Sequence, residues 1–265
     1  MLSHSQIRHI TSLKQKKFRE KYDEFIAEGE KIVLELIQSN YILSGIFTTI
    51  PGTKACVEEA QEKRIPVYEI TNREMERISG LSTPGPVLAV VKIPPAVVTS
   101  QSTLIRSSPI DRRTSSLLLV LDDIRDPGNL GTIIRIADWF GINPIVCSEN
   151  SVDQFNPKVV QATMGSIARI KVFYRDLVSF LKEFQGTIPI YGTFLKGENI
   201  YTSHLNPSGM ILIGNESHGI SADLHPFITT RLRIPSFNEQ PGAESLNASV
   251  ATAIVCSEFR RRYIL

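Results

Sequence analysis

The segments ILIGNESHGIS (211–221) and IPSFNEQPGAESLNASVATAI (234–254) carry the clearest structural pattern in the last part of the chain. Each begins with apolar residues and then changes to glycine and small polar residues, the pattern of a buried strand that runs into a loop. A third segment, NLGTIIRIADWFG (129–141), places similar residues at the start of a helical pattern. Small polar residues offer backbone amides and short hydrogen-bonding groups, so these three loops predict one shared pocket.

Apolar strands separated by helices fill the rest of the C-terminal half. The segments SLLLVLDD (116–123), NPIVCS (143–148) and GMILIG (209–214) lack an alternation of apolar and polar residues. This is typical of a parallel sheet that helices cover on both faces. Ligands of such sheets bind beyond the carboxyl ends of the strands. The sequence therefore predicts an α/β domain over residues 116–265, closed by a helix over 244–262.

Residues 1–95 predict a second, smaller α/β domain. Apolar residues recur at helical spacing within 29–39, and YILSGIFTT (41–49) and PVLAVVKI (86–93) have the composition of strands. Thr71 and Glu74 have the spacing of a capping box, which predicts the start of a short helix. Residues 96–115 are rich in proline, serine and threonine and are interpreted as an interdomain linker.

The composition is that of a globular protein with little net charge. The 265 residues are 42% hydrophobic and 21% charged, and the net charge of +2 is too small to indicate nucleic-acid binding by itself. The basic residues are nevertheless clustered near the N-terminus, where only Glu20 opposes Arg8, Lys14, Lys16, Lys17, Arg19 and Lys21. Such a cluster either holds phosphates or is a solvated basic segment.

The cysteines and the absence of targeting signals predict a cytoplasmic protein. Cys56, Cys147 and Cys256 are odd in number and far apart, which argues against a disulfide framework and a structural zinc site. No signal segment and no apolar run of membrane-spanning length occurs, so no membrane partner is expected. The dinucleotide fingerprint, the P-loop and the nucleophile elbow are also missing. The parallel sheet must bind its ligand in another way.

Several polar residues in the motif regions have two interpretations each. Asp122, Asp123 and Asp126 could hold magnesium, but turn formation and stabilisation of a helix N-terminus are the stronger interpretation. Arg135 lies among apolar helix residues and must reach water, an acid or a phosphate, with an ordinary salt bridge as the plain alternative. Asn129 could be the N-cap of that helix.

The other two motifs also carry polar residues with open roles. Glu216 and His218 follow the strand that ends at Gly214, and a lone histidine in such a loop is more often a surface residue than a catalytic one. Ser245 and Asn247 stand before the last helix, where they could act only as caps. The repetition of Asn, Gly and Ser in three loops favours a common site over three separate caps.

With these segments in place, the chain resembles the SpoU/TrmH-type RNA ribose 2′-O-methyltransferases of the SPOUT superfamily. The pattern N-L-G-x-x-x-R-x-A is matched by Asn129–Ala137, and G-x-E-x-x-G by Gly214–Gly219. The third pattern, I-P followed by E-S-L-N-x-S-V-A, is matched by Ile234–Pro235 and Glu244–Ala251. The stretch KKFREKYDEFIAEGEKIVLELI (16–37) is similar to the family's accessory substrate-binding domain, which is related to a ribosomal RNA-binding fold.

The resemblance implies a fold, a cofactor and a set of roles. It implies a SPOUT-type parallel sheet with a C-terminal trefoil knot, a homodimer with the terminal helix and the knot at its interface, and an RNA substrate. It implies that S-adenosyl-L-methionine contacts Thr193, Gly214, Ile234 and Leu246, and that no metal takes part. Arg135 would grip the target phosphate and stabilise the developing alkoxide. The ribose or Arg135 would be oriented by Asn129, Glu216, Ser245 and Asn247.

Other functions remain open at this level. The wider superfamily also methylates bases, and a non-catalytic RNA-binding or assembly protein is a different class. A metal-dependent phosphotransfer enzyme built on Asp122 and Asp123 ranks last. Ribosomal and transfer RNA are both plausible substrates, and Arg135 could serve its own or its partner's pocket. The chain departs from the family pattern in a longer loop between Pro235 and Glu244, and in Ala248 where valine is common.

Overall fold

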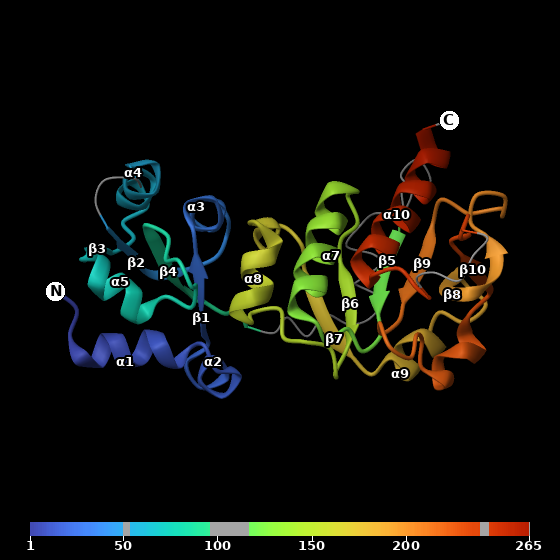
Figure 1. Cartoon of the computed structure of the whole chain (residues 1–265), viewed down its shortest axis with the longest axis horizontal. Coiled ribbons are helices and arrows are strands. Elements are labelled where there is room, and N and C mark those ends of the chain that lie inside the picture. Colours follow the sequence, from blue (N-terminus) through green and yellow to red (C-terminus); the bar gives the residue numbers. More distant parts are fainter. Residues whose placement is uncertain (50–53, 96–116, 239–243, 265) are drawn as a thin grey trace. The chain divides into compact units, whose positions relative to one another are not determined.

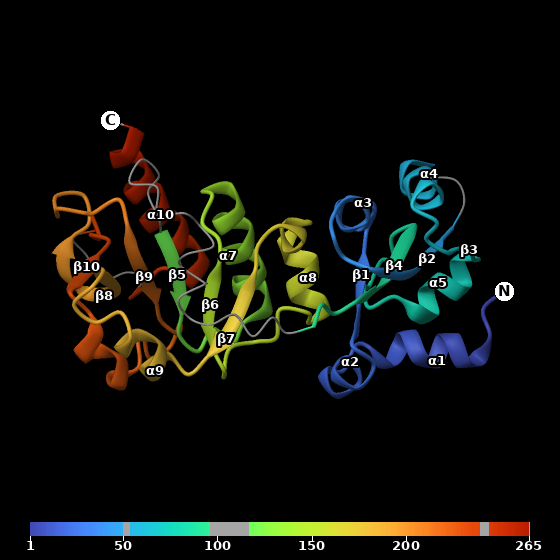
Figure 2. The same cartoon turned by 180° about the vertical axis from the view of Figure 1, so that it is seen from behind.

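The computed structural model describes residues 1–49, 54–95, 117–238 and 244–264. Its contacts divide the chain into two compact units, Met1–Val97 with Asp153–Arg169, and Val98–Val152 with Ile170–Leu265. The predicted linker, 96–115, lies outside the described residues. Each unit is an α/β structure (Figures 1 and 2), as the sequence predicts.

The first unit is built on a mixed four-stranded sheet with the order β1-β4-β2-β3. β1 and β2 are both antiparallel to β4, and β2 is parallel to β3. The strands are β1 (Glu24–Glu28), β2 (Leu43–Thr48), β3 (Val67–Glu69) and β4 (Val87–Lys92). The helices are α1 (His4–Ser12), α2 (Lys16–Tyr22), α3 (Glu30–Gln38), α4 (Lys54–Glu62), α5 (Asn72–Ile78) and α8 (Pro157–Thr163), with the 3₁₀ turn η1 (Ser166–Ala168).

Both faces of this sheet are buried because strand side chains alternate between two cores. Phe25 and Ala27 of β1 belong to a core that α3 and α4 complete together with Val160 of α8. Ile26, between them in the sequence, belongs to the other core, which contains Leu13 at the end of α1 and Met75 of α5. Successive side chains of β1 therefore point to opposite faces of the sheet, and the unit has three layers, with helices on both sides of the sheet.

The second unit contains a six-stranded sheet with the order β10-β8-β9-β5-β6-β7, in which every neighbouring pair is parallel. Its strands are β5 (Leu117–Leu121), β6 (Ile145–Ser148), β7 (Val172–Arg175), β8 (Ile190–Asn199), β9 (Gly209–Ile213) and β10 (Thr230–Arg233). Its helices are α7 (Pro127–Trp139), α9 (Leu177–Lys182) and α10 (Ala248–Ile264), with the 3₁₀ helix η2 (Ala222–Phe227). The predicted parallel sheet is confirmed.

Helices lie on both faces of this sheet (Figures 1 and 2). Leu118 and Val120 of β5 pack in one core with Phe180 of α9 and Leu224 of η2. The opposite face is covered by α7 and α10, which pack against each other. β5 and β9 are completely buried, as the uninterrupted apolar segments require.

Two expectations about helices need correction. The sequence analysis did not predict the helices α1 and α2, although Ser3 and Gln6 form a capping box at the start of α1. The terminal helix begins at Ala248 instead of 244, because residues 244–247 form a bend before it. None of the described helices is long and apolar enough to cross a membrane.

Candidate active site

The candidate site of the second unit begins at the carboxyl ends of three neighbouring strands. Gly214 follows β9 and Ile234 follows β10, while Thr193 follows the last residue of β8 that pairs with β9. The Thr193 hydroxyl donates to the Leu212 carbonyl at 3.2 Å, so it is fixed against the neighbouring strand. Three of the four residues expected to contact the cofactor therefore lie at the same edge of one sheet, within or directly after adjacent strands.

Gly214 starts a tight turn that tolerates no side chain at this position. The turn is closed by two backbone hydrogen bonds between Asn215 and Gly219, of 3.0 and 2.9 Å. A Cβ atom on residue 214 would lie 2.3 Å from the Gly219 carbonyl carbon and 2.3 Å from the Ile220 nitrogen. Gly219 itself has a φ of +73°, a conformation that favours glycine. Both glycines of the G-x-E-x-x-G pattern are thus required by the backbone.

The β5–α7 loop holds this turn from the side. Asn215 donates through Nδ2 to the Asp123 carbonyl at 2.7 Å, and His218 Nε2 lies 3.1 Å from Asp123 Oδ2. Arg125 donates to the other carboxylate oxygen of Asp123 at 2.8 Å. Burial by itself would raise the pKa of Asp123, but the hydrogen bonds from Arg125 and His218 outweigh burial and lower it. Asp123 is therefore a charged anchor at neutral pH.

The aspartates after β5 all make contacts that hold loops. Asp122 accepts from the Ser221 backbone at 2.7 Å, and Asp126 caps α7 by accepting from the Asn129 backbone at 2.8 Å. Together with the role of Asp123, this agrees with the interpretation of these acids as turn and helix-start residues. It also corrects one alternative, because the N-cap of α7 is Asp126 and Asn129 lies three residues inside the helix.

Asn129 connects all three sequence motifs through its side chain. Its Nδ2 donates to Glu216 Oε1 at 2.5 Å, and its Oδ1 accepts from Asn247 Nδ2 at 2.8 Å. Asn247 Oδ1 in turn accepts from the Ser249 backbone at 3.0 Å and from the Ser249 hydroxyl at 2.6 Å. We call the side chains of Glu216, Asn129 and Asn247 the amide relay. It brings together three of the five residues predicted to be catalytic.

The amide relay also fixes which way each amide points. A carboxylate can accept hydrogen bonds but not donate them, so Asn129 turns its NH2 group toward Glu216 and its carbonyl oxygen toward Asn247. Asn247 then donates to Asn129 and uses its own oxygen to cap α10. Asn247 therefore caps the helix with one end of its side chain, as the capping interpretation predicts, and contacts Asn129 with the other end.

Ser245 and Leu246 lie just before this capping residue. Both are exposed in the bend that precedes α10, and Leu246 keeps 47% of its surface accessible. Within the described part of the chain Ser245 has no hydrogen-bond partner, so the structure does not join it to the amide relay. Part of the unusually long loop before it, residues 239–243, lies outside the described residues.

Arg135 lies on the exposed side of α7, six residues beyond Asn129. The ordinary salt bridge that was the plain alternative is not found among the described residues. Trp139 follows one helical turn later, at the i+4 position of the same face, with 85% of its surface exposed. The structure thus places Arg135 on the same exposed helix face as Trp139 and outside the amide relay.

The basic N-terminal segment splits into buried and exposed members. Arg19 is only 2% exposed and bonds to Asp153 Oδ2 at 2.6 Å and to the carbonyl oxygen of Leu13 at 3.0 Å. Lys14 donates to the Ser79 carbonyl at 2.5 Å. These two residues stabilise the first unit, whereas Arg8, Lys16, Lys17 and Lys21 are exposed.

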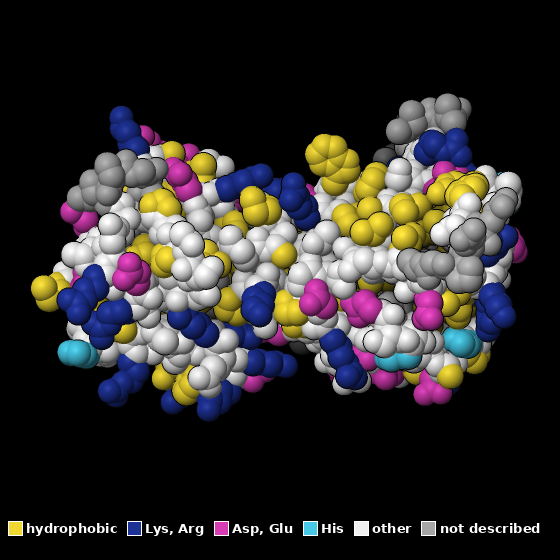
Figure 3. All heavy atoms as spheres, viewed as in Figure 1, with side chains coloured by type: hydrophobic (Ala, Val, Ile, Leu, Met, Phe, Trp, Pro, Cys, Tyr) yellow, Lys and Arg dark blue, Asp and Glu magenta, His cyan; other side chains and the backbone are white. Residues whose placement is uncertain are grey.

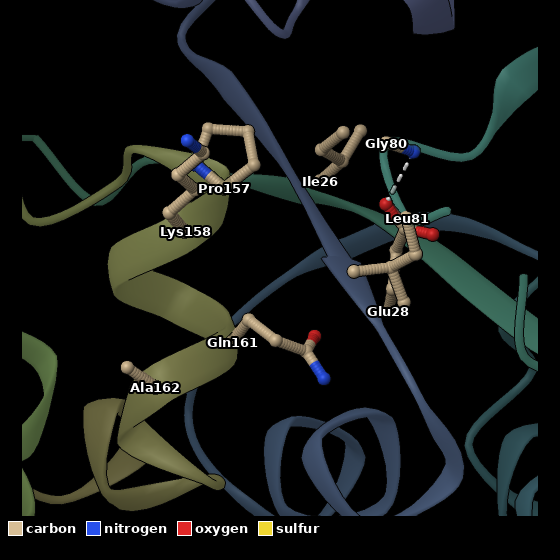
Figure 4. Close-up of a pocket in the computed structure, with 8 residues that line it drawn as sticks. All are labelled: Ile26, Glu28, Gly80, Leu81, Pro157, Lys158, Gln161 and Ala162. Carbon is tan, nitrogen blue, oxygen red and sulfur yellow. Dashed lines mark hydrogen bonds between the residues drawn. The ribbon is translucent and has the colours of Figure 1, made fainter. Parts of the chain in front are cut away.

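The first unit also contains a cavity that the sequence analysis did not predict (Figure 4). It has a volume of about 290 Å³ and lies between α8 and the sheet. Glu28 at its wall accepts from the Gly80 backbone at 2.8 Å and from the Ser79 hydroxyl. Gln161 of α8 points toward β1 across the cavity.

Comparisons with known proteins match both units. Residues 116–257 match the SpoU rRNA Methylase family, and residues 4–89 match the MRM3-like substrate binding domain. The 23S rRNA (guanosine(2553)-2′-O)-methyltransferase RlmP of Bacillus subtilis is 30% identical over 254 residues, which cover 94% of this chain and 93% of that protein. The chain belongs to the SpoU rRNA methylase family.

Solved structures agree with this membership. A structure from Porphyromonas gingivalis, assigned to the TrmH family of RNA methyltransferases, is 36% identical with a TM-score of 0.81, covering 99% of both chains. An AdoMet-bound rRNA methyltransferase from Sinorhizobium meliloti is 26% identical with a TM-score of 0.82, covering 99% of this chain and 96% of that one. The predicted family, its α/β fold and an S-adenosyl-L-methionine-dependent RNA ribose methyltransferase activity are confirmed.

Proposed function

We propose that this SpoU-family enzyme methylates the 2′-hydroxyl of a ribose in ribosomal RNA. The amide relay carries the proposal, because it joins the three motifs of the family into one site at the carboxyl ends of the strands. The name of the Bacillus subtilis relative, a 23S rRNA 2′-O-methyltransferase, supports ribosomal RNA over transfer RNA and ribose over base. The match of residues 4–89 to a substrate binding domain supports a structured RNA.

The donor site would be formed by Thr193, Gly214, Ile234 and Leu246. These residues carry no charge, and apolar surface remains accessible on Ile234 at the end of β10 and on Leu246 before α10. Such a set suits the adenosine part of S-adenosyl-L-methionine, whose rings need apolar walls and backbone hydrogen bonds. When bound, the donor supplies an electrophilic methyl group on a sulfonium. The Gly214–Gly219 turn would hold the backbone groups in place.

Arg135 would hold the target phosphate and stabilise negative charge on the ribose oxygen. A guanidinium remains protonated at any ordinary pH and can bind phosphate through two parallel hydrogen bonds. Its exposed position on α7 leaves it accessible to RNA. The amide relay would orient the ribose, because Glu216 and Asn247 keep hydrogen-bonding capacity beyond their contacts with Asn129. Ser245, exposed beside Asn247, would join them when RNA is bound.

A homodimer would complete the site. Trp139, Leu246 and Val250 are exposed by 85%, 47% and 47%, and hydrophobic side chains gather over α7 and α10 (Figure 3). Exposed apolar surface of this kind marks an interface. Because Arg135 shares a helix face with Trp139, a dimer formed through this face would bring Arg135 to the partner's pocket. We propose that it acts there, on RNA bound to the other subunit.

Three further properties are proposed from the family resemblance. The segments around the Gly214–Gly219 turn and the start of α10 would form a trefoil knot, which is a rare exception to the usual rules of chain connection. The enzyme would work in the cytoplasm without a metal. The three cysteines support a reducing compartment, since all are free thiols buried in the protein.

The proposed function is tested by the position of a labelled methyl group. The protein would be incubated with S-adenosyl-L-methionine carrying a radioactive methyl and with ribosomal RNA that lacks modifications, and the RNA would then be hydrolysed in alkali. A 2′-O-methyl group blocks cleavage at that ribose, so the label should appear in dinucleotides. Label in mononucleotides would favour base methylation, and no label on any RNA would favour a non-catalytic RNA-binding protein.

A further inference from the structure

The short helix α2 carries three pairs of side chains on three sides. Residues four apart share a helix side, so Lys16 lies above Glu20, Lys17 above Lys21, and Phe18 above Tyr22. The remaining residue, Arg19, points inward to Asp153 and anchors the helix. Only the Lys16–Glu20 side is charge-compensated, by an exposed contact of 3.7 Å. The other two sides form one surface with a positive and an aromatic half.

The aromatic half of this surface is ordered. The rings of Phe18 and Tyr22 are stacked at 6.3 Å with an interplanar angle of 10°, and His9 of α1 meets Tyr22 edge-on at 4.7 Å. Tyr22 remains 36% exposed. An aromatic ring that is held by its neighbours and still accessible offers a stacking face that needs little further ordering.

The positive half lies directly beside these rings. Lys17 Nζ is 5.0 Å from the centre of the Phe18 ring, and Lys21 Nζ is 5.2 Å from the centre of the Tyr22 ring. Neither lysine has an ion-pair partner among the described residues. Figure 3 shows Lys and Arg side chains together with hydrophobic ones over α1 and α2. Two unpaired cations beside two parallel rings match the alternating phosphates and bases of an RNA strand.

We propose that this surface, formed by Lys17, Phe18, Lys21 and Tyr22, binds an unpaired segment of the RNA substrate. Lys17 and Lys21 contact phosphates, and a base stacks on Tyr22. The segment must be single-stranded, since a base within a duplex has no free face for a side chain. The proposal rests on the RNA methyltransferase function, and it assigns to the first unit a contact made by helices instead of by the cavity beside α8.

The test is fluorescence anisotropy of the full-length protein with a labelled single-stranded oligouridylate over a series of salt concentrations. The variant Lys17→Ala/Lys21→Ala should weaken binding and reduce the slope of log K against log salt by about 1.4, the value for two phosphate contacts on a single strand. The matched control, Lys54→Ala/Arg73→Ala, removes two exposed charges from α4 and α5 and should leave the slope unchanged.

The stacking contact has its own pair of variants. Tyr22→Leu should weaken binding about thirtyfold, the central cost of losing one stacked base, whereas Tyr22→Phe keeps the ring and should bind normally. Equal losses in both variants would contradict stacking, as would equal binding of duplex RNA. The same loss in the α4/α5 control would contradict a specific surface. Loss confined to Gln161→Ala would place the RNA in the cavity beside α8 and overturn the proposal.

The outcomes also separate this inference from the function itself. Methyl transfer to ribosomal RNA by the wild-type protein, together with unchanged RNA binding by the lysine and tyrosine variants, would refute the surface and leave the enzyme intact. The protein could instead bind phosphatidylserine vesicles more tightly than oligouridylate, with the two ligands competing. That result would assign the surface to membranes. A wild-type protein that binds no RNA would refute both.

Discussion

Asn129 donates a hydrogen bond of 2.5 Å from its side-chain nitrogen to Glu216, although 87 residues separate the two in the sequence. The same side chain accepts from Asn247 on its other end. Because an amide has one donor end and one acceptor end, Asn129 is suited to link a carboxylate on one side to an amide donor on the other. The asparagine at position 129 of this chain therefore has a geometric reason.

Replacement of Asn129 by alanine should reduce kcat/KM about 100-fold. The loss has a geometric cause, since Glu216 and Asn247 would no longer be held in the orientation that the ribose requires. The double variant Asn129→Ala/Asn247→Ala should be no worse than the first single variant, because residues acting through one network are not additive. Steady-state kinetics with ribosomal RNA would measure all three proteins. If the double variant instead lost kcat/KM by the product of the two single losses, the amide relay would be contradicted.

Addition of one methyl group at Gly214 should weaken donor binding at least tenfold. In Gly214→Ala the new Cβ would lie 2.3 Å from the Gly219 and Ile220 backbone, so the turn must shift. The free energy of unfolding should fall by about 1–3 kcal/mol, the usual cost of overpacking. Calorimetric titration with S-adenosyl-L-methionine and denaturation by urea would test both effects. The control Gly85→Ala lies outside the site, at a position where a Cβ atom would meet only the Gly29 Cα atom at an ordinary contact distance of 3.9 Å. Unchanged donor affinity in Gly214→Ala would remove Gly214 from the site.

Glu74 should make the stability of the first unit depend on pH in the acidic range. Backbone donation from Thr71 and Leu2 lowers the pKa of Glu74 to about 2. A depressed pKa in the folded state stabilises above the unfolded value of about 4.3, and this contribution is lost as pH falls from there toward 2. Glu74→Gln should therefore lower Tm at pH 7 and flatten its dependence on pH below 4.5. The control Glu76→Gln, at an exposed position of α5, should retain the wild-type pH dependence.

Two inactive chains should restore activity when they form one dimer. A dimer of one Arg135→Ala chain and one Gly214→Ala chain contains a single intact donor pocket, on the Arg135→Ala chain. If Arg135 serves the partner's pocket, that pocket receives the arginine of the Gly214→Ala chain and methylates RNA. Co-expression with two affinity tags would isolate the mixed dimer. An inactive mixed dimer, alongside an active wild-type dimer tagged in the same way, would show that Arg135 acts within its own subunit.

The apolar strands could be predicted from the sequence because their signal is local. The segments around β5, β6 and β9 are apolar without interruption, and a strand buried on both faces requires this pattern. The end of β8 was harder to predict. β8 continues to Asn199 through the exposed residues Leu195, Lys196 and Gly197, since its last part pairs with β10, where Leu232 lies opposite Glu198. No local sequence pattern indicates that a strand pairs with another that is distant in the chain.

The candidate site could be predicted only in part, because its motifs are local in the sequence and the contacts between them are not. The three motifs could be identified, yet the hydrogen bonds that join Asn129 to Glu216 and Asn247 cross 87 and 118 residues. For Arg19, the sequence suggested a functional role that the structure does not support. It was counted with the basic cluster, but it is buried and paired with Asp153, which lies 134 residues away in the sequence. His218 was given little weight, although it lies against the anchoring carboxylate of Asp123.

The central claim is that Arg135 acts on the RNA and not on the methyl donor. Single-turnover methyl transfer to ribosomal RNA, measured for Arg135→Ala beside calorimetric titration of the same protein with S-adenosyl-L-methionine, tests it most directly. We expect transfer to fall at least about 100-fold, the scale of losing one group that stabilises developing charge, while the donor Kd changes less than about twofold. Transfer at the wild-type rate, or a loss of donor binding that matches the loss of transfer, would contradict the account.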